Sequence, residues 1–426
     1  MPDPDPQKPD PQNADVQKPD PRNADVPQPD SRSSASQPAN IRPQLTFDFA
    51  RLRRHPDVEA DNLFAVDASD RLILDEAATA ISGCGPGELV VIDDHYGALT
   101  LGAIAEHSAV DVRVHQDAMT GQLALDANAK RAGISGFTHH GLGPSLLSGA
   151  RVVLLQLPRS LGALDEIAAQ IARHAASDVL VVSGGRLKHM SVTMNGVLGR
   201  HFRDVRASLG RQKSRVITAR QPVTIVADAG ATAATALDVS PWPEREYHPD
   251  LDLWIHAHGG VFAGTKVDIG TRFLLGFLDE MAVDAKTAID LGCGTGLLAT
   301  ALARRRPGVE VFASDESHAA VASTRATAEA NGVVVEVVRD VGLSGRADAS
   351  ADLVLLNPPF HTGSTVHAGI ALTLFTDAAR VLRPGGELWT VFNSHLQYRP
   401  ALTRVVGNTR QAGRTNKFTV TVSTKR

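Results

Sequence analysis

The chain has 426 residues, of which 43% are hydrophobic and 21% are charged. This composition is ordinary for a globular protein, and the length leaves room for two or three domains. The sequence holds no run of about 18 apolar residues, so no membrane span is predicted. The net charge of −4 excludes a strongly basic protein, and the two cysteines, Cys84 and Cys293, fall in different predicted domains. We therefore expect no disulfide framework, and a reducing cytoplasm fits best.

The first 40 residues are predicted to form a disordered tail. A ten-residue sequence at 7–16 is repeated almost unchanged at 17–26. Proline blocks helix and sheet, and too few apolar groups are present to offset the entropy of an ordered chain. The tail lacks the apolar segment of a secretory signal, and it is either a plain spacer or a recruitment segment. Its seven Asp outnumber its four Lys or Arg, so the remaining body is nearly neutral and any contact with nucleic acid needs a local basic patch.

Folded sequence begins near Leu45, and from there to about Val239 β-type segments alternate with helical ones. Leu161–His174 is a clear amphipathic helix, because its apolar residues recur on one face. Leu99–Glu106 is a second predicted helix. The predicted strands are Leu89–Ile92, Val110–Val114, Arg151–Leu155 and Val179–Val182. This alternation indicates a parallel sheet with crossover helices.

The sequence Ser-Pro-Trp-Pro at 240–243 interrupts the pattern and marks a predicted domain boundary. We expect a first domain at 41–245 and a second at 246–426. The second repeats the α/β alternation, with helices at Leu297–Arg305 and Ala368–Leu382 and a tight turn at Arg383–Gly386. Its predicted strands are Ala288–Asp290, Val309–Ala313, Val333–Val338, Leu353–Leu356, Glu387–Phe392 and Phe418–Val422.

The two domains resemble copies of one another. Val91–Leu99 matches Ala288–Gly296, with Asp93 aligned to Asp290, and the Gln-Leu-Pro-Arg of 156–159 matches the Asn-Pro-Pro-Phe of 357–360. The first copy keeps only Gly97 of the glycine-rich loop, so we expect that its backbone cannot turn closely around a ligand. The sequence favours a duplicated fold with a degenerate first copy; the alternative is that any two Rossmann-like units look alike in outline.

The second copy has a glycine-rich loop between a predicted strand and a predicted helix. Its glycines permit positive φ angles and a close approach of the backbone to a ligand at the helix N-terminus; they are Gly292, Gly294 and Gly296. A dinucleotide is the alternative ligand, but no residue for hydride chemistry is evident. Two acidic residues favour S-adenosylmethionine. Asp290 is placed to neutralise its methionine ammonium, and Asp315, at the end of the next strand, to accept hydrogen bonds from both ribose hydroxyls.

Two further acidic residues, together with Asn357, complete the predicted cofactor site. Asp340 ends the following strand, where its carboxylate can meet the adenine amino group; a solvated turn residue is the alternative. Asp268 lies in the segment Phe262–Arg272, just upstream of the second α/β unit. This segment is either a flap that closes over the methionine end of the cofactor or a plain turn that starts a helix.

The sequence Asn357-Pro358-Pro359-Phe360 follows a predicted strand. An exocyclic amine on a base is a poor nucleophile, because its lone pair is delocalised into the ring. The side-chain oxygen of Asn357 and the carbonyl of Pro358 can each accept one N–H bond and so free that lone pair. Pro359 helps to fix the loop, and Phe360 offers a face on which the base stacks. The motif predicts methyl transfer to an amino nitrogen by positioning and electrostatics, without a metal; a plain Pro-Pro turn is the alternative.

A basic run lies in the first domain. Residues 186–220 contain nine Lys or Arg and a single acidic residue, Asp204. Such a run suits contacts with phosphates, and an ordinary solvated surface is the alternative. The candidate RNA-binding residues are Arg203, Arg206, Arg211, Lys213 and Arg215.

With these motifs the chain resembles the ribosomal RNA guanine-N2 methyltransferases of the RsmC/RlmG type. The similar segments are Phe64–Asp70, Asp94–Leu99, Val267–Arg272, Asp290–Gly296, the Asn-Pro-Pro-Phe-His of 357–361, Asn393–Leu396 and Asn416–Phe418, and the resemblance covers residues 45–426. It implies an α/β protein with two tandem Rossmann-like class I methyltransferase domains, an inactive first domain, and guanine N2 as the target. The C-terminal segment is more similar to the large-subunit branch. The acidic tail and Asp340, where Asn is usual, depart from the family pattern.

The predicted activity is thus S-adenosylmethionine-dependent methylation of a guanine in 16S or 23S ribosomal RNA by a cytoplasmic monomer without a metal. One alternative keeps the chemistry but changes the acceptor to adenine N6 of DNA or RNA, or to a protein glutamine amide. Another is a cofactor-binding RNA chaperone without turnover. The Phe-His at 360–361 and the degenerate first copy favour guanine, and the intact Asn357 argues against the chaperone.

Overall fold

The computed structural model describes residues 47–223, 241–359 and 365–426, apart from the side chains of 365–368. Residues Leu45–Arg426 form one compact unit. The predicted tail at 1–40 lies outside the described residues, as do Ser240 of the predicted boundary and the Phe360 and His361 of the second motif. We call residues 47–223 the first half and 241–426 the second half.

Seven strands form the sheet of the first half, in the order β3-β2-β1-β4-β5-β7-β6. All pair in parallel except β7, which is antiparallel to both β5 and β6. The strands are β1 (Leu89–Ile92), β2 (Val112–His115), β3 (Phe137–His139), β4 (Val152–Gln156), β5 (Leu180–Arg186), β6 (Phe202–Ala207) and β7 (Ser214–Pro222). The helices are α1 (Ala68–Ser82), α2 (Ala98–His107), α3 (Met119–Ala132), α4 (Pro144–Leu147), α5 (Leu161–His174) and α6 (Thr193–His201).

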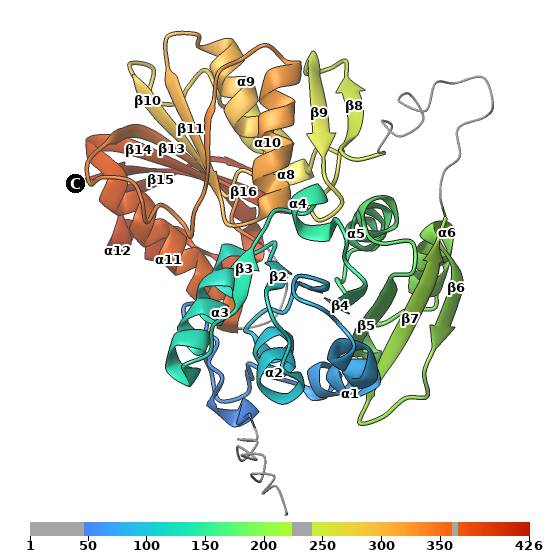
Figure 1. The fold of residues 1–426 in the computed structure, drawn as a ribbon. Helices are drawn as coiled ribbons and strands as arrows, with labels where there is room; N and C mark the ends of the chain where they lie inside the picture. Colours follow the sequence, from blue (N-terminus) through green and yellow to red (C-terminus); the bar gives the residue numbers. More distant parts are fainter. Residues whose placement is uncertain (1–46, 224–240, 360–364) are drawn as a thin grey trace, which may run out of the picture. The chain divides into compact units, whose positions relative to one another are not determined.

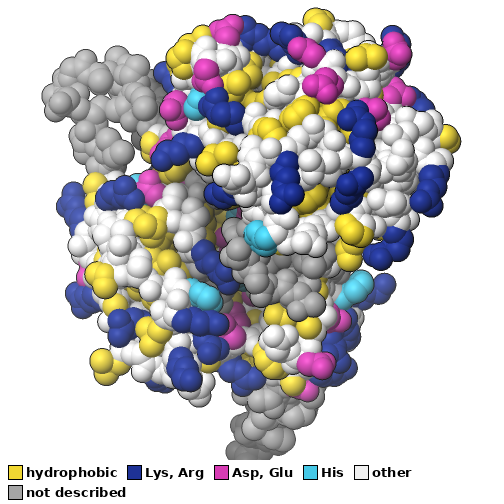
Figure 2. All heavy atoms as spheres, turned by 180° about the vertical axis from the view of Figure 1, so that it is seen from behind, with side chains coloured by type: hydrophobic (Ala, Val, Ile, Leu, Met, Phe, Trp, Pro, Cys, Tyr) yellow, Lys and Arg dark blue, Asp and Glu magenta, His cyan; other side chains and the backbone are white. Residues whose placement is uncertain are grey.

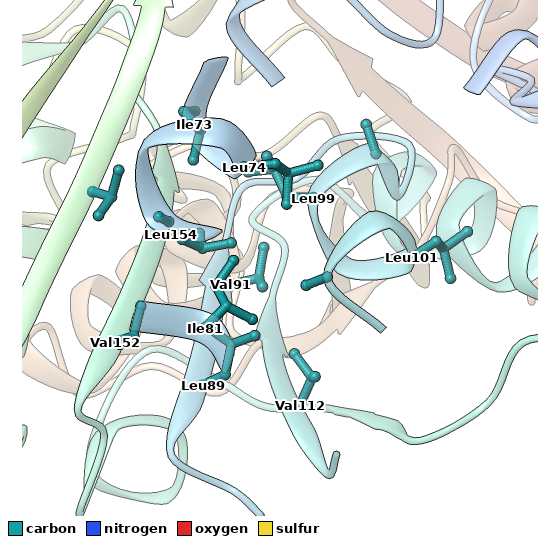
Figure 3. Packing of buried hydrophobic residues seen from close by; sticks show 14 of the residues in the cluster. Ile73, Leu74, Ile81, Leu89, Val91, Leu99, Leu101, Val112, Val152 and Leu154 are labelled. Atoms are coloured by element: carbon teal, nitrogen blue, oxygen red, sulfur yellow. The ribbon is translucent and has the colours of Figure 1, made fainter. Parts of the chain in front are cut away.

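Helices cover both faces of this sheet, which explains why its central strands are apolar throughout. On one face Leu74 of α1 and Leu99 of α2 belong to the same buried cluster as Val91 of β1, as Figure 3 shows. On the other face Ile92 of β1 packs in a cluster with Ile167 of α5. Successive side chains of a strand point to opposite faces, so a run such as Leu89–Ile92 is buried at every position.

The second half contains a sheet in the corresponding order, β12-β11-β10-β13-β14-β16-β15, with β16 antiparallel to its neighbours. Its strands are β10 (Thr287–Leu291), β11 (Glu310–Asp315), β12 (Glu336–Arg339), β13 (Ala351–Leu356), β14 (Leu382–Asn393), β15 (Gly407–Arg414) and β16 (Phe418–Lys425). Its helices are α8 (Ile269–Leu275), α9 (Leu297–Arg305), α10 (His318–Ala330), α11 (Thr365–Val381) and α12 (Arg399–Val405).

Short elements complete the chain. A hairpin of β8 (Glu244–His248) and β9 (Leu253–Ala257) precedes the second sheet and lies against α10. Three single turns of 3₁₀ helix are η1 (Phe49–Arg51), η2 (Leu187–His189) and η3 (Ser394–Leu396). Because the two sheets share one strand order, the predicted tandem Rossmann-like fold is confirmed (Figure 1).

The sequence placed some elements well and others poorly. The bounds of β1, α5 and α9 are those predicted. The tight turn predicted at Arg383–Gly386 instead lies inside β14, as a bulge where pairing jumps from Ala351 with Leu382 to Leu353 with Glu387. Helix α10 was not predicted, because it buries small residues such as Ala and Thr and shows no strong apolar stripe.

Candidate cofactor and methyl-acceptor site

The predicted site residues of the second half gather at the carboxyl edge of its sheet. The glycine loop follows β10, Asp315 ends β11, and Asn357 follows β13. Strands β11, β10 and β13 are adjacent and parallel, so their carboxyl ends meet along one edge. This edge is where open α/β sheets bind ligands.

The three loop glycines have different roles. Their φ angles are 73° at Gly292, 56° at Gly294 and 74° at Gly296, in the left-handed region that favours glycine. A Cβ atom on Gly292 or Gly294 would meet nothing within 4 Å, whereas one on Gly296 would lie 2.6 Å from Cγ2 of Thr324. The first two glycines thus leave space beside the backbone for a ligand. The third allows α9 to begin close to α10.

Asp315 holds the loop from the neighbouring strand. Its Oδ2 accepts the amide of Gly294 at 3.0 Å, and its Oδ1 accepts the amide of Ser317 at 3.0 Å. Burial raises the pKa of Asp315. Each carboxylate oxygen keeps a second lone pair, so the group remains able to accept hydrogen bonds from the two predicted ribose hydroxyls.

Asp290 lies beneath the loop. Its side chain is only 2% exposed, and its Oδ2 accepts the amide of Ala299, in the first turn of α9, at 3.0 Å. Burial raises the pKa of Asp290 to about 7. In this position Asp290 fixes the junction between β10 and α9. An ion pair between Asp290 and the ammonium group of a ligand stays a prediction.

We expect Asp290→Asn to raise the free energy of unfolding at pH 8 by about 1–3 kcal/mol. The folded pKa of about 7 exceeds the reference value of 3.8. The stability contributed by the protonated carboxyl is therefore present at low pH and is lost as the pH rises from about 4 through 7. Asparagine still accepts the amide of Ala299 but does not ionise. Denaturant titrations at pH 5 and pH 8 measure the difference, and equal pH dependence in both proteins would contradict this argument.

The same variant tests the predicted contact with the cofactor. If the Asp290 carboxylate pairs with an ammonium group, the affinity for S-adenosylmethionine measured by calorimetry falls in Asp290→Asn. If Asp290 only fixes the loop, the affinity is unchanged, because the amide preserves the contact with Ala299.

Asp340 is engaged locally. Its Oδ1 accepts the hydroxyl of Ser344, and its Oδ2 accepts the amide of Gly345 at 2.8 Å. The side chain is 8% exposed. A structured turn therefore accounts for this residue, and its contact with an adenine amino group stays a prediction.

Asn357 carries the most informative contacts of the site. Its Nδ2 donates to Oγ1 of Thr271 at 2.9 Å and lies 3.4 Å from Oδ2 of Asp268. A carboxylate can only accept hydrogen bonds, so these contacts fix which end of the amide is nitrogen. The opposite atom, Oδ1 of Asn357, is buried and has no hydrogen-bond partner among the described residues. Buried acceptors are normally satisfied, so this oxygen is available for a donor on a ligand.

Asp268 reaches the site through Asn357. It caps α8, and its Oδ2 accepts the amides of Gly270 and Thr271 at 2.9 and 3.2 Å. The turn that starts a helix is therefore confirmed, and closure as a flap stays a prediction. The contact between Asp268 and Asn357 joins residues 89 positions apart and was not predicted.

Neighbouring residues complete the acceptor side. Pro358 is buried and Pro359 is exposed, whereas Phe360 lies outside the described residues. Asn393, at the carboxyl end of β14, was not among the expected site residues. Its Oδ1 is also buried without a partner in the part of the chain that the structure describes. The Asn-Ser-His-Leu sequence that begins there was the only signal that pointed to it.

The first half lacks this arrangement at the equivalent strand end. Gln156 ends β4, is 7% exposed, and donates from Nε2 to Oδ1 of Asp70. Its Oε1 lies 3.5 Å from the hydroxyl of Ser69. Burial raises the pKa of Asp70 to about 8. The amide of Gln156 is thus held in a buried polar cluster by Asp70 and Ser69, and unlike Asn357 it does not present an oxygen without a partner.

The loop of the first half turns through the same region of backbone conformation. Its residues in the left-handed region are Asp93 at φ 55°, His95 at 61° and Gly97 at 98°. These angles lie in the same left-handed region as those of the three glycines in the second half, so the loop turns without three glycines. That its backbone cannot approach a ligand closely stays a prediction. Asp and His tolerate this region better than most residues. The first copy differs because it places two side chains where the second leaves open space.

The alignment of the two loops also changes. Ile92 ends β1 and Leu291 ends β10, and Gly97 and Gly296 occupy the positions just before the following helices. Asp93 therefore corresponds to Gly292, two positions later than the Asp290 that we had expected. By the same register, Gln116 takes the place of Asp315, and its Oε1 accepts the amide of His95 at 3.1 Å.

The candidate RNA-binding residues lie on one hairpin at the edge of the first sheet. Arg203 and Arg206 are on β6, Arg215 is on β7, and Arg211 and Lys213 are in the turn between them. Side chains alternate along a strand, so Arg203 and Arg206 point to opposite faces. Arg211 pairs with Asp75 at 2.8 Å. The structure groups these residues at one edge of the sheet but not on one face of it. On the face of the molecule that Figure 2 shows, Lys and Arg are spread widely, with Asp and Glu among them.

The described residues contain neither a metal-binding cluster nor a membrane-spanning helix. In residues 47–223, 241–359 and 365–426, no group of three or more His, Cys, Asp or Glu is arranged to hold a metal ion. Over those ranges, no helix has the length and apolar character to cross a membrane.

Both halves match known families. Residues 41–223 match the RLMG N-terminal domain, and residues 252–422 match the Methyltransferase small domain. The chain is 35% identical to "Ribosomal RNA large subunit methyltransferase G" of Streptomyces avermitilis, over 88% of this chain and 97% of that relative. The protein of the same name from Shewanella amazonensis is 32% identical over 88% of this chain and 96% of that relative.

A solved structure shares the fold over nearly the whole chain. It is the T. thermophilus 16S rRNA N2 G1207 methyltransferase (RsmC) in complex with AdoMet and guanosine. The TM-score is 0.62 at 21% identity, and the match covers 89% of this chain and 99% of that chain. At this identity the likeness shows the fold, with both Rossmann-like units included.

Proposed function

The chain belongs to the ribosomal RNA large subunit methyltransferase G family, and we propose that it transfers a methyl group from S-adenosylmethionine to the exocyclic N2 amine of a guanine in ribosomal RNA. The observation that carries this proposal is the buried Oδ1 of Asn357, which has no hydrogen-bond partner within residues 47–223, 241–359 and 365–426. Its amide is oriented from behind by Thr271 and Asp268. An acceptor held in this way suits an incoming N–H donor.

The acceptor amine is activated by geometry alone. Oδ1 of Asn357 and the carbonyl of Pro358 each accept one of its two N–H bonds, which draws the nitrogen towards tetrahedral geometry and localises its lone pair. Phe360 stacks on the base. This mechanism needs no metal, because the residues position the amine and stabilise the charge that develops on it.

The cofactor fits the opposite side of the same edge. S-adenosylmethionine, when bound, would supply an electrophilic methyl group and leave as S-adenosylhomocysteine, and the amine would release one proton for the methyl group that it gains. Gly292 and Gly294 leave space for the cofactor beside the protein backbone. Asp315 accepts hydrogen bonds from the ribose hydroxyls, and Asp340 accepts one from the adenine amino group. The carboxylate of Asp290 neutralises the charge of the methionine ammonium. Digestion of rRNA treated with the protein and labelled cofactor tests the proposal. The expected product is N2-methylguanosine, and labelled N6-methyladenosine would favour the alternative acceptor.

We assign the two halves different tasks. The domain at 246–426 performs the chemistry, and the degenerate domain at 41–245 binds RNA through the β6–β7 hairpin. The tip and edge of this hairpin carry five basic residues, of which all but Arg215 are exposed. The protein acts as a cytoplasmic monomer on rRNA or on a ribosomal subunit.

Replacing all five basic residues of the hairpin by serine is expected to weaken RNA binding and flatten its salt dependence. They are Arg203, Arg206, Arg211, Lys213 and Arg215. Each phosphate contact that is lost lowers the slope of log K against log salt concentration by about one unit. Filter binding to rRNA between low and high salt measures this slope, and cofactor affinity stays at the wild-type value.

A matched control removes positive charge elsewhere. Lys130, Arg131 and Lys286 are exposed and lie outside the hairpin, so replacing them by serine leaves the salt slope nearly unchanged. If the hairpin variant keeps the wild-type affinity and slope, the first half is not the RNA platform. If the control lowers the slope as much, RNA binding depends on overall charge.

A further inference from the structure

The two halves meet through equivalent positions of their duplicated folds. Ala118 forms an isolated antiparallel bridge with Ser317. The amide of Met119 donates to the carbonyl of Glu316 at 3.0 Å, and the amide of His318 donates to that of Asp117 at 2.9 Å. Ala118 and Ser317 are 199 residues apart, as are Gly97 and Gly296 of the two loops. The contact is therefore pseudo-symmetric, like the self-complementary interface of a two-fold dimer.

An acidic residue of each half caps a helix of the other. Oδ1 of Asp117 accepts the amide of Ala319, in the first turn of α10, at 2.9 Å. Oε2 of Glu316 accepts the hydroxyl of Thr120, in the first turn of α3, at 2.7 Å. Carboxylates at helix N-termini satisfy amides that have no partner within the helix. Each half thus fixes the start of a helix in its neighbour.

Asp117 of the first half is held in place by Asp93, a residue of the loop that corresponds to the glycine loop of the second half. Asp93, in the position of Gly292, accepts the amide of Asp117 at 3.2 Å. A non-glycine residue at φ 55° persists only where its surroundings hold it there. Asp93 therefore occupies the space that Gly292 leaves open in the second half, and it also supports Asp117, which caps α10.

The anchored segments of the second half carry its cofactor residues. Glu316 directly follows Asp315, whose Oδ1 accepts the amide of Ser317. Asp340 directly follows Arg339, and Arg339 joins the halves. Its Nε donates to the carbonyl of Glu316 at 3.1 Å, and its Nη2 donates to the carbonyls of Gln116 and Asp117 at 2.8 and 3.0 Å.

We propose that Asp117 and Arg339 are positioning residues that hold the cofactor-binding turns after β11 and β12 in the geometry that binds S-adenosylmethionine. This inference rests on the proposed function. Neither residue is one of the predicted cofactor ligands. Asp117 acts through the amide of Ala319, four residues after Asp315, and Arg339 acts through the carbonyl of Glu316 and precedes Asp340. The degenerate half is in this sense a structural part of the cofactor site.

The test compares two variants of the full chain that break equivalent contacts. Asp117→Ala removes the cap on α10, beside the cofactor residues. Thr120→Val keeps the shape of the side chain and removes the hydroxyl that donates to Glu316 at the start of α3, but it leaves the longer contact, 3.4 Å, between the amide of residue 120 and Oε2 of Glu316. We expect Asp117→Ala to raise Kd and KM for S-adenosylmethionine about fivefold to tenfold, as for a moderate coupling between sites. The kcat at saturating cofactor changes less than about threefold.

Two further variants and a stability measurement complete the test. Asp117→Asn keeps an acceptor for Ala319 and restores most of the affinity. Arg339→Lys keeps the positive charge but cannot reproduce the hydrogen bonds that the guanidinium donates to the carbonyls of Gln116, Asp117 and Glu316. We expect it to weaken cofactor binding as much as Asp117→Ala does. Thr120→Val keeps the wild-type affinity. Thermal unfolding of each variant identifies any loss that reflects global destabilisation.

Two results would overturn the inference. One is wild-type cofactor affinity in both Asp117→Ala and Arg339→Lys. The other is an equal loss in Thr120→Val, which would mean that the contact between the halves only adds general stability. Failure of the proposed function looks different, because then the wild-type protein itself neither binds S-adenosylmethionine nor methylates rRNA.

Discussion

Asn357→Ala is expected to lower the rate of methyl transfer to rRNA by at least about a hundredfold, as removal of a positioned transition-state partner does elsewhere. The variant removes Oδ1 of Asn357, which is buried and has no hydrogen-bond partner among the described residues. Its effect falls on the acceptor amine, so the affinity for S-adenosylmethionine measured by calorimetry stays within about twofold of wild type. Single-turnover rates at saturating cofactor measure the chemical step directly.

Thr271→Val supplies a graded control for this prediction. Valine keeps the shape of Thr271 but removes the oxygen that accepts the Nδ2 hydrogen bond of Asn357 at 2.9 Å. We expect a rate between those of the wild type and Asn357→Ala, because Asp268 still orients the amide. Near wild-type turnover in Asn357→Ala would refute the assigned role of Asn357.

Gly294→His is expected to abolish detectable cofactor binding, with Kd raised by at least about a hundredfold, since several buried contacts are lost together. The equivalent position of the first half holds His95 at φ 61°, close to the 56° of Gly294. The first half thus holds a histidine in this backbone geometry, although a side chain at the positive φ of Gly294 is strained. The imidazole fills the open space beside Gly294. Calorimetry with S-adenosylmethionine checks the loss, and thermal unfolding checks the fold.

The reciprocal variant, His95→Gly, provides the control. It opens the first loop but leaves Gln116 in place of an acidic residue at the end of β2, so no second cofactor site is created. Wild type and His95→Gly both bind one cofactor per chain. Two cofactors per chain in wild type, or unchanged affinity in Gly294→His, would contradict the view that only the second copy kept a cofactor site.

Local sequence patterns predicted much of the fold and the place of the candidate site residues at the carboxyl edge of the second sheet. The buried strand Leu89–Ile92 and the amphipathic helix Leu161–His174 follow from apolar patterns that few other structures satisfy. The glycine loop and the Asn-Pro-Pro-Phe motif sit at strand ends, and parallel strands bring such ends to one edge. The strand order shared by the two sheets confirmed the tandem Rossmann-like fold, and the origin of the two halves by duplication stays a prediction.

Interactions between distant residues were not predictable in the same way. The hydrogen bond from Asn357 to Asp268 depends on how α8 packs, and the bridge between Ala118 and Ser317 joins two turns without an apolar pattern. The turn of the degenerate loop was not predictable for a different reason. Three glycines are not essential for it, because Asp93 tolerates a positive φ that its neighbours enforce.

The most direct test of the central claim is to map N2-methylguanosine in the ribosomal RNA of cells that lack the gene. We predict that one N2-methylguanosine of the large-subunit RNA is absent from these cells, that the wild-type gene restores it, and that Asn357→Ala does not, although the variant protein is folded and present. An unchanged set of methylated guanines in the cells without the gene would contradict the proposed function.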